Sequence, residues 1–257
     1  MCWMIAVFDS GIGGLGILSM MLPLFDGESV VYAADRANAP YGTKSLDEVR
    51  QLTHDNASRL IDLGASTVVL ACNTASAAAL DSLREQFDGT RFVGMEPALK
   101  PASAATRSGV VGVVATSATF QGRLFESLMD RFAEGLRVIT RAAPEWVEIV
   151  EKGDLTSVAA TNTVRMHTDP LIEEGADTLV LGCTHFGFLA PTIVRAAGDE
   201  LLVIDPAPAV ARQARAVHVN DENGGSLSAR VSGDAAQFAN LSKTVAGISF
   251  PDGVLPL

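Results

Sequence analysis

The chain has 257 residues, of which 48% are hydrophobic and 19% are charged, and its formal net charge at pH 7 is -11. This composition is typical of a globular chain that buries a core in one large domain or two small ones, and it excludes an intrinsically disordered chain. The negative charge argues against a nucleic-acid partner or an anionic membrane surface, because both require clustered lysine and arginine. An anionic substrate would therefore have to be held locally, by backbone N–H groups and hydroxyls.

Short apolar runs rich in valine and isoleucine alternate with helix-like segments along the chain. Strands are predicted at residues 5–8, 29–33, 67–71 and 91–94, and again at 110–114, 136–140, 178–182 and 201–204. Helices are predicted at 45–63, 75–87, 153–167 and 209–218, and residues 220–228 have the composition of a loop. This alternation predicts an α/β fold of mostly parallel sheets with helices on both faces.

The chain contains an internal duplication. Residues 60–74 (LIDLGASTVVLACNT) align without gaps with residues 171–185 (LIEEGADTLVLGCTH); eight of fifteen positions are identical, and Cys72 is aligned with Cys183. We therefore predict two pseudo-symmetric lobes, the first formed by residues 1–98 and completed by 208–257, the second by 99–207. Each lobe would place its cysteine just after the carboxyl end of a buried strand, where open parallel sheets bind ligands, and both cysteines would face one cleft.

Three cysteines, Cys2, Cys72 and Cys183, form an odd and sparse set, so we expect free thiols rather than a disulfide framework. No apolar run approaches the length that crosses a bilayer, and the first residues enter a strand-like segment without a positively charged leader. We therefore expect a cytoplasmic protein whose thiols are available for chemistry.

The alternative for the duplicated cysteines is that both are small core residues in a relic of an old duplication. Polar side chains argue against this alternative, because Asn73 and Thr74 follow the first cysteine and Thr184 and His185 follow the second. Such groups would be costly in a dry core, so the two positions are more typical of a ligand site.

A glycine-rich turn follows the first predicted strand. Gly11, Gly13 and Gly16 have the G-x-G-x-x-G spacing, and Asp35 ends the next strand, so a dinucleotide-binding site is one interpretation. The same turn would equally well bring a helix N-terminus close to a substrate carboxylate. The dinucleotide interpretation gives no role to Asp9 or to the paired cysteines.

Two facing thiols suit the inversion of a stereocentre by proton transfer. The reaction requires a base on one face of the carbon and an acid on the other, and a thiolate with a thiol supplies this pair in either direction. Because a free thiol is mostly protonated at neutral pH, each cysteine needs a partner. We expect Asp9 to assist Cys72, since their strands should be neighbours, and His185 to assist Cys183 from two residues away.

Other chemistries fit the sequence less well. A zinc site of Cys72, Cys183, His185 and Asp9 has acceptable ligands, but the paired C-x-x-C spacing of structural zinc is absent. None of the four lysines lies in a motif typical of a pyridoxal enzyme, and the G-x-S-x-G string of a serine hydrolase is absent. We therefore expect neither a metal nor an organic cofactor.

Five strings lie in order along the chain: FDSGIGG at residues 8–14, PYG at 40–42, ACNTAS at 71–76, EPA at 96–98 and LGCTH at 181–185. Together they resemble the bacterial glutamate racemases, from the start of the chain to about residue 210. The resemblance implies catalytic roles for Cys72, Cys183, Asp9, His185 and Glu151. For Glu151, which most nearly matches a further acid of the family, an exposed carboxylate on a helix face is the alternative.

The resemblance also implies substrate contacts. These contacts carry over to Asp9, Ser10, Tyr41, Gly42, Asn73, Thr74, Thr116, Thr119, Thr184 and His185. The chain departs from the family where Phe186-Gly187-Phe188 replaces an aromatic residue, Pro and Leu, and where Ala143 replaces the cysteine before Pro144. The departures put substrate preference and turnover in question more than the type of reaction.

We therefore expect an enzyme that interconverts L- and D-glutamate by two-base proton transfer and supplies D-glutamate for peptidoglycan. Asp9 and His185 favour glutamate, because the related aspartate racemases typically lack the Asp-Ser of the first loop and carry another residue after the second Cys-Thr. Racemisation of aspartate or another acidic amino acid is the alternative enzyme, and an anion-binding or dinucleotide-binding protein without catalysis is the alternative of another class. The oligomeric state is open, with a homodimer among the options.

Overall fold

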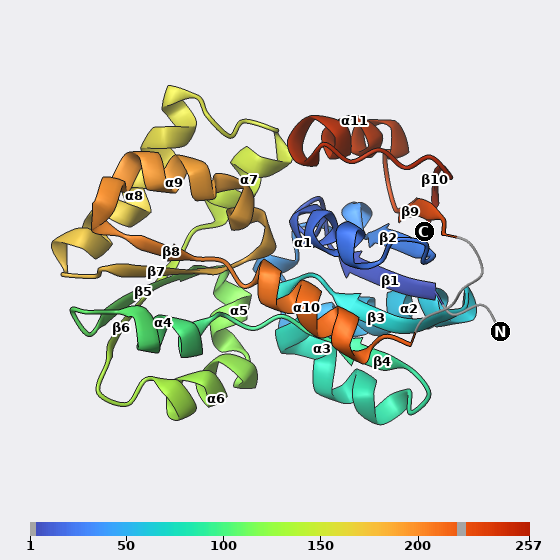
Figure 1. Ribbon diagram of the computed structural model, residues 1–257, viewed down its shortest axis with the longest axis horizontal. Helices are drawn as coiled ribbons and strands as arrows, with labels where there is room; N and C mark the ends of the chain where they lie inside the picture. The colour runs from blue at the N-terminus through green and yellow to red at the C-terminus, as the bar shows by residue number, and fades with distance from the viewer. Residues whose placement is uncertain (1–3, 220–224) are drawn as a thin grey trace.

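The computed structural model describes residues 4–219 and 225–257, and Cys2 lies outside them. One sheet contains β1 (Met4–Asp9), β2 (Val30–Ala34), β3 (Ala65–Leu70), β4 (Arg91–Val93), β9 (Leu227–Val231) and β10 (Val254–Pro256), in the order β10-β9-β2-β1-β3-β4. The other contains β5 (Val110–Ala115), β6 (Arg137–Ala142), β7 (Thr178–Gly182) and β8 (Leu202–Ile204), in the order β6-β5-β7-β8. Every pairing is parallel. Figure 1 shows the two sheets side by side, as the predicted two-lobed α/β class requires.

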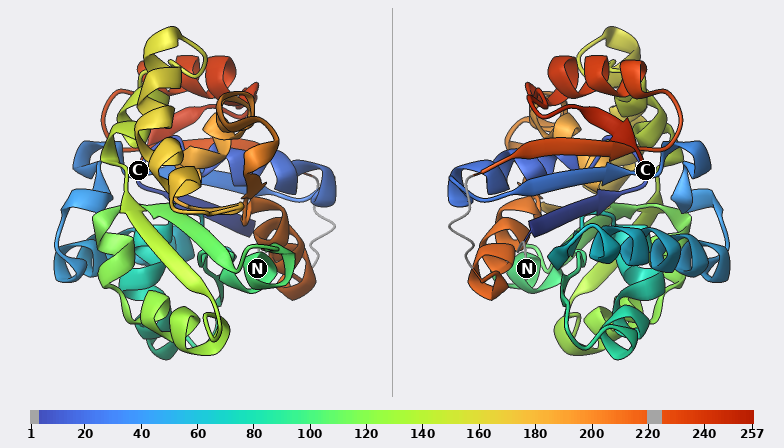
Figure 2. Two further views of the ribbon diagram at one scale, coloured as in Figure 1. Left: turned by 90° about the vertical axis from the view of Figure 1, so that its left-hand side faces the viewer. Right: turned by 90° about the vertical axis from the view of Figure 1, so that its right-hand side faces the viewer.

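Helices cover both faces of each sheet (Figure 2). Around the six-stranded sheet lie α1 (Leu15–Met21), α2 (Leu46–Asp62), α3 (Asn73–Gln86), α10 (Ala207–Val217) and α11 (Ala235–Ala246). Around the four-stranded sheet lie α4 (Leu99–Ala105), α5 (Ser117–Gln121), α6 (Arg123–Phe132), α7 (Pro144–Glu151), α8 (Val158–Glu173) and α9 (Ala190–Ala197). Short 3₁₀ helices are η1 (Leu22–Leu24), η2 (Arg36–Asn38), η3 (Tyr41–Thr43), η4 (Thr184–Leu189) and η5 (Gly198–Glu200).

Alternation along the buried strands divides the core. In β1, Ile5 and Val7 belong to the cluster that contains residues of α1, α10 and α11, while Ala6 and Phe8 belong to the cluster that contains residues of α2 and α3. The first cluster continues into the other half, where it includes Leu181 of β7 and residues of α7, α8 and α9. The two halves therefore share one hydrophobic core on one side of the sheets.

Strand pairing places the ends that carry the predicted site. Phe8 of β1 pairs with Leu70 of β3, so the turns that follow these strands are neighbours, as predicted for Asp9 and Cys72. In the second sheet Ala115 pairs with Gly182, which brings Thr116 beside Cys183. Parallel strands thus direct both cysteines to the carboxyl edges of their sheets.

Two predicted elements differ from the structure. The helix predicted at 153–167 is wrong at both ends: α7 stops at Glu151, Gly153 has a φ of 73°, and α8 begins after Ser157, whose hydroxyl accepts a hydrogen bond from the N–H of Ala160, and continues to Glu173. Of the loop predicted at 220–228, residues 220–224 lie outside the described residues, and residues 227 and 228 begin β9. The sequence analysis does not predict β9, β10 or α11.

The limits of the two lobes, at residues 98 and 207, stay a prediction.

Among the described residues, no helix combines the length and the apolar character needed to cross a membrane.

Candidate active site

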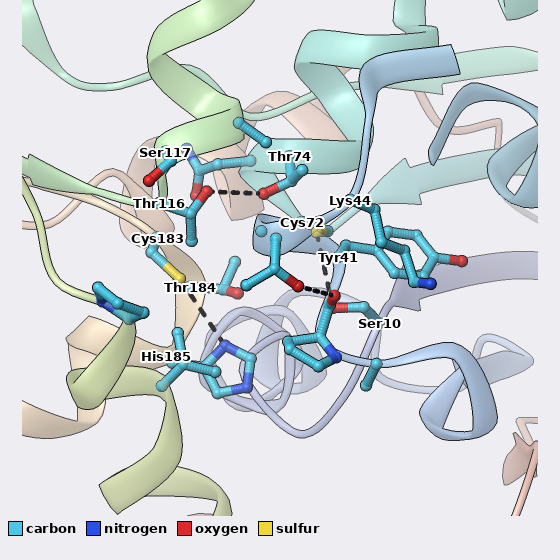
Figure 3. Close-up of a pocket in the computed structure, with 18 of the residues that line it drawn as sticks. Ser10, Tyr41, Lys44, Cys72, Thr74, Thr116, Ser117, Cys183, Thr184 and His185 are labelled. Carbon is cyan, nitrogen blue, oxygen red and sulfur yellow. Dashed lines mark hydrogen bonds between the residues drawn. The ribbon is translucent and has the colours of Figure 1, made fainter. Parts of the chain in front are cut away.

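A cavity of about 700 Å³ lies where the carboxyl ends of the strands in the two halves meet. Its wall contains Ser10, Tyr41, Gly42, Cys72, Asn73, Thr74, Thr116, Glu151, Cys183, Thr184 and His185. All of these were expected at the site from the sequence. Two further expected residues, Asp9 and Thr119, are buried but do not line the cavity. Figure 3 shows Cys72 with Ser10 on one side of the cavity and Cys183 with His185 on the other.

Cys72 ends the turn after β3 and caps the N-terminus of α3. Its Sγ accepts a hydrogen bond from the N–H of Ala75, with a separation of 3.5 Å, and lies 3.9 Å from the Oγ of Ser10. Burial raises the pKa of Cys72 well above the range of an ordinary thiol, and the nearby charge of Asp9 raises it further. At neutral pH Cys72 is therefore a protonated thiol in this structure.

Asp9 lies beneath the glycine-rich turn rather than in the cavity wall. Its Oδ2 accepts hydrogen bonds from the N–H groups of Gly11 at 3.2 Å and Gly14 at 2.9 Å, while Oδ1 is buried without a partner. Burial raises the pKa of Asp9, although the charge of His185 opposes that rise. The direct neighbour of the Cys72 sulfur is Ser10, and the effect of Asp9 on Cys72 is electrostatic: its charge raises the pKa of the thiol.

The glycine-rich turn lets the two halves approach each other. A Cβ on Gly13 would lie 2.4 Å from the Oγ1 of Thr184 and 2.5 Å from the Nδ1 of His185, so no larger residue fits there. Asp35, which the dinucleotide interpretation would place on a ribose, accepts hydrogen bonds from Asn38, Tyr41, Asn56 and Ser232 instead. Its carboxylate is therefore engaged inside the protein.

Cys183, His185 and Glu151 form a hydrogen-bonded row. The Sγ of Cys183 lies 3.8 Å from the Nδ1 of His185, and the Nε2 of His185 lies 2.8 Å from the Oε1 of Glu151. Burial alone would lower the pKa of His185, but its hydrogen bonds to Cys183 and Glu151 outweigh burial and raise that pKa well above the usual value. Burial alone would raise the pKa of Glu151, but the hydrogen bond and charge of His185 lower it overall. These contacts favour the protonated form of the His185 ring between Cys183 and Glu151.

Hydroxyls from both halves meet at another part of the cavity. The Oγ1 of Thr74 lies 3.0 Å from the Oγ1 of Thr116, which in turn lies 2.9 Å from the Oγ1 of Thr119 behind it. The Tyr41 hydroxyl donates to Asp35 at 2.7 Å and so faces the protein interior. Asn73 differs from all of these residues, because both polar atoms of its side chain are buried without a partner in the described part of the chain.

The structure adds residues to the cavity wall that were not expected from the sequence, among them Arg36, Lys44, Ser117, Gln121 and Glu148. Arg36 is the most notable, because its Nη2 lies 3.5 Å from the Oε2 of Glu151. The two residues are 115 positions apart, so no local motif could have joined them.

The geometry does not support the zinc alternative. Within residues 4–219 and 225–257, no group of three or more histidine, cysteine, aspartate or glutamate side chains is placed to hold a metal ion. His185 uses both ring nitrogens on Cys183 and Glu151, and Asp9 points to backbone N–H groups.

The chain is similar in sequence and structure to known racemases. Residues 20–214 match the model of the Asp/Glu/Hydantoin racemase family. The chain is 46% identical to a glutamate racemase of Roseiflexus sp. (strain RS-1), over 92% of this chain and 90% of the relative, and 48% identical to one of Pseudomonas entomophila (strain L48), over 81% and 79%. The glutamate racemase isoform RacE1 of Bacillus anthracis superposes with a TM-score of 0.88 at 27% identity, covering 99% of this chain and 97% of that one. The Escherichia coli glutamate racemase in complex with L-glutamate and an activator gives 0.87 at 27% identity, covering 100% and 98%.

Two parallel-sheet halves that each bring a thiol to one shared cavity, together with the match to the racemase family, define an amino-acid racemase, which is an isomerase. The chain belongs to the Asp/Glu/Hydantoin racemase family, and within that family to the glutamate racemases, which confirms the resemblance of its motifs.

Proposed function

We propose that the protein interconverts L- and D-glutamate without a cofactor, with Cys72 and Cys183 as the two proton-transferring groups. The observation that carries the proposal is the placement of two free, buried thiols, from equivalent points of a duplicated unit, in the wall of one cavity. Such a pair offers an acid and a base to opposite faces of a single carbon.

In each turnover the thiolate of one cysteine removes the α-proton, so that an S–H bond forms as the C–H bond breaks. The electron pair of that bond is held as a carbanion beside the substrate's α-carboxylate. The opposite thiol then donates its proton to the other face of the carbon and becomes the thiolate. The two cysteines have exchanged protonation states, which prepares the enzyme for the other enantiomer until solvent exchange resets it.

The two thiols have different helpers, as expected for a chiral substrate. On one side the imidazolium of His185 places a positive charge 3.8 Å from the Cys183 sulfur, and Glu151 stabilises that charge. On the other side, of the residues that the structure describes, only Ser10 with its hydroxyl and Ala75 with its N–H lie within hydrogen-bonding distance of the Cys72 sulfur, and Asp9 lies behind them. The α-proton would therefore be transferred under unequal electrostatic control on its two faces.

The remaining residues of the wall suit an acidic amino acid. We assign the substrate's polar groups to the unpartnered amide of Asn73 and to the hydroxyls of Thr74, Thr116 and Thr184, in agreement with the need to hold an anion in a chain of net charge -11. Glutamate is the substrate that agrees with the relatives, since those at 43–48% identity are glutamate racemases. The product D-glutamate would serve peptidoglycan synthesis in the cytoplasm.

The proposal is tested by following deuterium from heavy water into glutamate with Cys72→Ser and Cys183→Ser variants. We expect each variant to lose racemisation by about a thousandfold, within the range that positioned acid–base groups contribute. A single remaining cysteine can still remove and return a proton from its own face. Each variant should therefore exchange the α-proton of one enantiomer without inverting it, and the two variants should favour opposite enantiomers.

Cys2→Ser is the thiol control and should keep wild-type turnover. Inversion that survives either active-site substitution at the wild-type rate would refute the two-thiol mechanism, and so would exchange of the same enantiomer in both variants. Faster turnover of aspartate than of glutamate by the wild-type protein would leave the mechanism in place and correct the substrate.

A further inference from the structure

Arg36 connects the six-stranded half of the molecule to the row of groups beside Cys183. It follows β2 as the first residue of η2, and its side chain is only 13% exposed in the cavity wall. Its Nη2 lies 3.5 Å from the Oε2 of Glu151, which belongs to α7 of the other half, and its Nη1 is buried without a partner. The reaction steps proposed above do not use this cation.

The backbone around Arg36 is fixed by its neighbours. Asp35, the preceding residue, accepts hydrogen bonds from Tyr41 at 2.7 Å and Ser232 at 2.7 Å. The N–H of Ala37, the following residue, donates to the Oγ of Ser232 at 2.9 Å. The guanidinium therefore projects from a rigid support, which is what a group needs in order to orient another side chain.

Glu151 is held from three directions. Its Oε1 accepts hydrogen bonds from the Nε2 of His185 at 2.8 Å and from the N–H of Ile12 at 2.9 Å, and its Oε2 faces Arg36. The two donors fix the position of Oε1. The orientation of the carboxylate then depends on the contact that Oε2 makes. Arg36 supplies that contact, and its positive charge also favours the ionised carboxylate.

We propose that Arg36 is a positioning residue of the racemase, which orients Glu151 so that Glu151 in turn holds His185 against Cys183. The inference depends on the proposed roles of Glu151 and His185 in proton transfer. It means that the acid–base group on one face of the substrate is set by a residue from the opposite half of the molecule. A direct contact between the buried Nη1 of Arg36 and the substrate is the competing role, and the test separates the two.

The test is a double-mutant cycle of Arg36→Met and Glu151→Gln, with kcat and KM measured in both directions. We expect Arg36→Met to lower kcat about tenfold with little change in KM, which is the worth of one charge-assisted contact. In the Glu151→Gln background the same substitution should change kcat less than about twofold, because its route to His185 is already broken. Arg36→Lys should recover part of the lost kcat, since it keeps the charge but not the planar fork.

Arg141→Met is a matched control. Arg141 also pairs with a glutamate, Glu174, at 3.6 Å, and it also has a buried nitrogen without a partner, but it does not line the cavity. We expect Arg141→Met to leave kcat and KM within about twofold of the wild type. That result would show that the loss of a half-buried arginine does not by itself lower activity. Since two enantiomers have equal free energies, kcat/KM must change by the same factor in both directions, which checks the measurements.

The outcomes are distinct. If Arg36→Met raises KM and its effect multiplies with that of Glu151→Gln, Arg36 contacts the substrate directly and the positioning role is wrong. If Arg36→Met has no effect while Glu151→Gln lowers kcat, the inference fails and the proposed function stands. If Glu151→Gln itself keeps wild-type kcat, the proposed role of Glu151 fails, and the role of Arg36 fails with it.

Discussion

Asn73 begins α3 at the wall of the cavity, and the residue is only 2% exposed. Neither polar atom of its side chain forms a hydrogen bond with any residue that the structure describes. Buried polar atoms without partners are rare, because each costs about 1–3 kcal/mol of desolvation. Asn56 shows the ordinary case, since its buried amide donates to the carboxylate of Asp35 and to the carbonyl of Leu52. The cost at Asn73 is explained if a ligand supplies the missing hydrogen bonds.

We expect Asn73→Ala to raise KM for glutamate by about ten- to a hundredfold, which corresponds to one or two lost hydrogen bonds to a charged group. The same substitution should leave the free energy of unfolding unchanged or slightly higher, because it removes atoms that are unsatisfied in the free protein. Steady-state kinetics and urea unfolding of the same samples measure both effects. Asn56→Ala should show the reverse pattern, with lower stability and a nearly unchanged KM; a loss of stability in Asn73→Ala with normal KM would contradict the assignment.

Which residues could be found from the sequence depends on how far apart their partners are. Cys72, Asn73, Cys183, Thr184 and His185 stand in two aligned strings, so the chain itself points to them. Arg36 and Glu148 reach the cavity only through folding, and no spacing predicts the contact between Arg36 and Glu151. The expected contact of Asp9 with Cys72 was sound at the level of neighbouring strands, but side-chain direction decided that Ser10 is the nearer group.

At the scale of elements, the two copies of the duplicated unit have diverged after the cysteine. Cys72 is followed directly by the α-helix α3, whereas Cys183 is followed by the 3₁₀ helix η4 before α9 begins. At Gly187, where the chain departs from the family, a Cβ would lie 2.9 Å from the Oδ2 of Asp205, so the Asp205 side chain would have to shift to admit a larger residue. The tighter turn in the second copy is what brings His185 back to the sulfur of Cys183.

Asp177 joins the loop between α4 and β5 to the start of β7. Its carboxylate accepts hydrogen bonds from the hydroxyl of Thr106 at 2.6 Å and from the N–H groups of Arg107 and Ser108 at 2.7 Å each. Although its limited burial would raise its pKa slightly, these hydrogen bonds lower that pKa well below the usual value. A carboxyl whose pKa is lowered on folding stabilises the protein above its unfolded pKa, and that contribution is lost as the pH falls toward the folded pKa.

We therefore expect Asp177→Asn to lower the free energy of unfolding by about 1 kcal/mol at pH 7, a value reduced for the exposure of the group. The difference between wild type and variant should stay constant from pH 7 to about pH 5 and shrink as the pH falls below the unfolded pKa of about 4, because the unfolded wild-type chain then binds a proton that the folded carboxylate does not. Urea unfolding at several pH values measures it. A difference that stays constant or grows at acid pH would show that the charge of Asp177 is not what stabilises the loop.

Prediction of the fold succeeded where the signal is local and failed where it is not. The buried strands of both halves are short apolar runs that contain valine, and their alternation with helices predicts a parallel α/β class. Strands β9 and β10 lie at the edge of the six-stranded sheet, where β9 is only partly buried and β10 has just three residues, so neither has a clear apolar run. The start of α8 was misplaced because Gly153 and Ser157, which separate it from α7, lie in a polar stretch with helix-like spacing.

At the scale of the whole molecule, one hydrophobic cluster and one cavity are shared by both halves. The cluster runs from Ile5 in the six-stranded sheet to Leu181 in the four-stranded sheet, and Glu151 accepts a hydrogen bond from Ile12 across the boundary. The cavity wall likewise combines Asn73 and Thr74 of one half with Thr116 and Thr184 of the other. A substrate held by the proposed contacts should stabilise both halves together, because those contacts come from residues of each half.

We expect glutamate at about a hundred times its Kd to raise the free energy of unfolding by about 2.7 kcal/mol, as binding to the folded state alone requires. For a chain of this size that increase raises Tm by about 5–10 °C in a single unfolding transition. Cys72→Ser protein, which should not consume either enantiomer, allows L- and D-glutamate to be compared by calorimetry, with leucine as the control ligand and Asn73→Ala as the control variant. Both controls should show a much smaller shift. Two separate unfolding transitions, with glutamate raising the Tm of only one, would mean that the halves unfold independently and that one half alone holds the substrate. This result would contradict the mechanism, which requires a site formed by both halves.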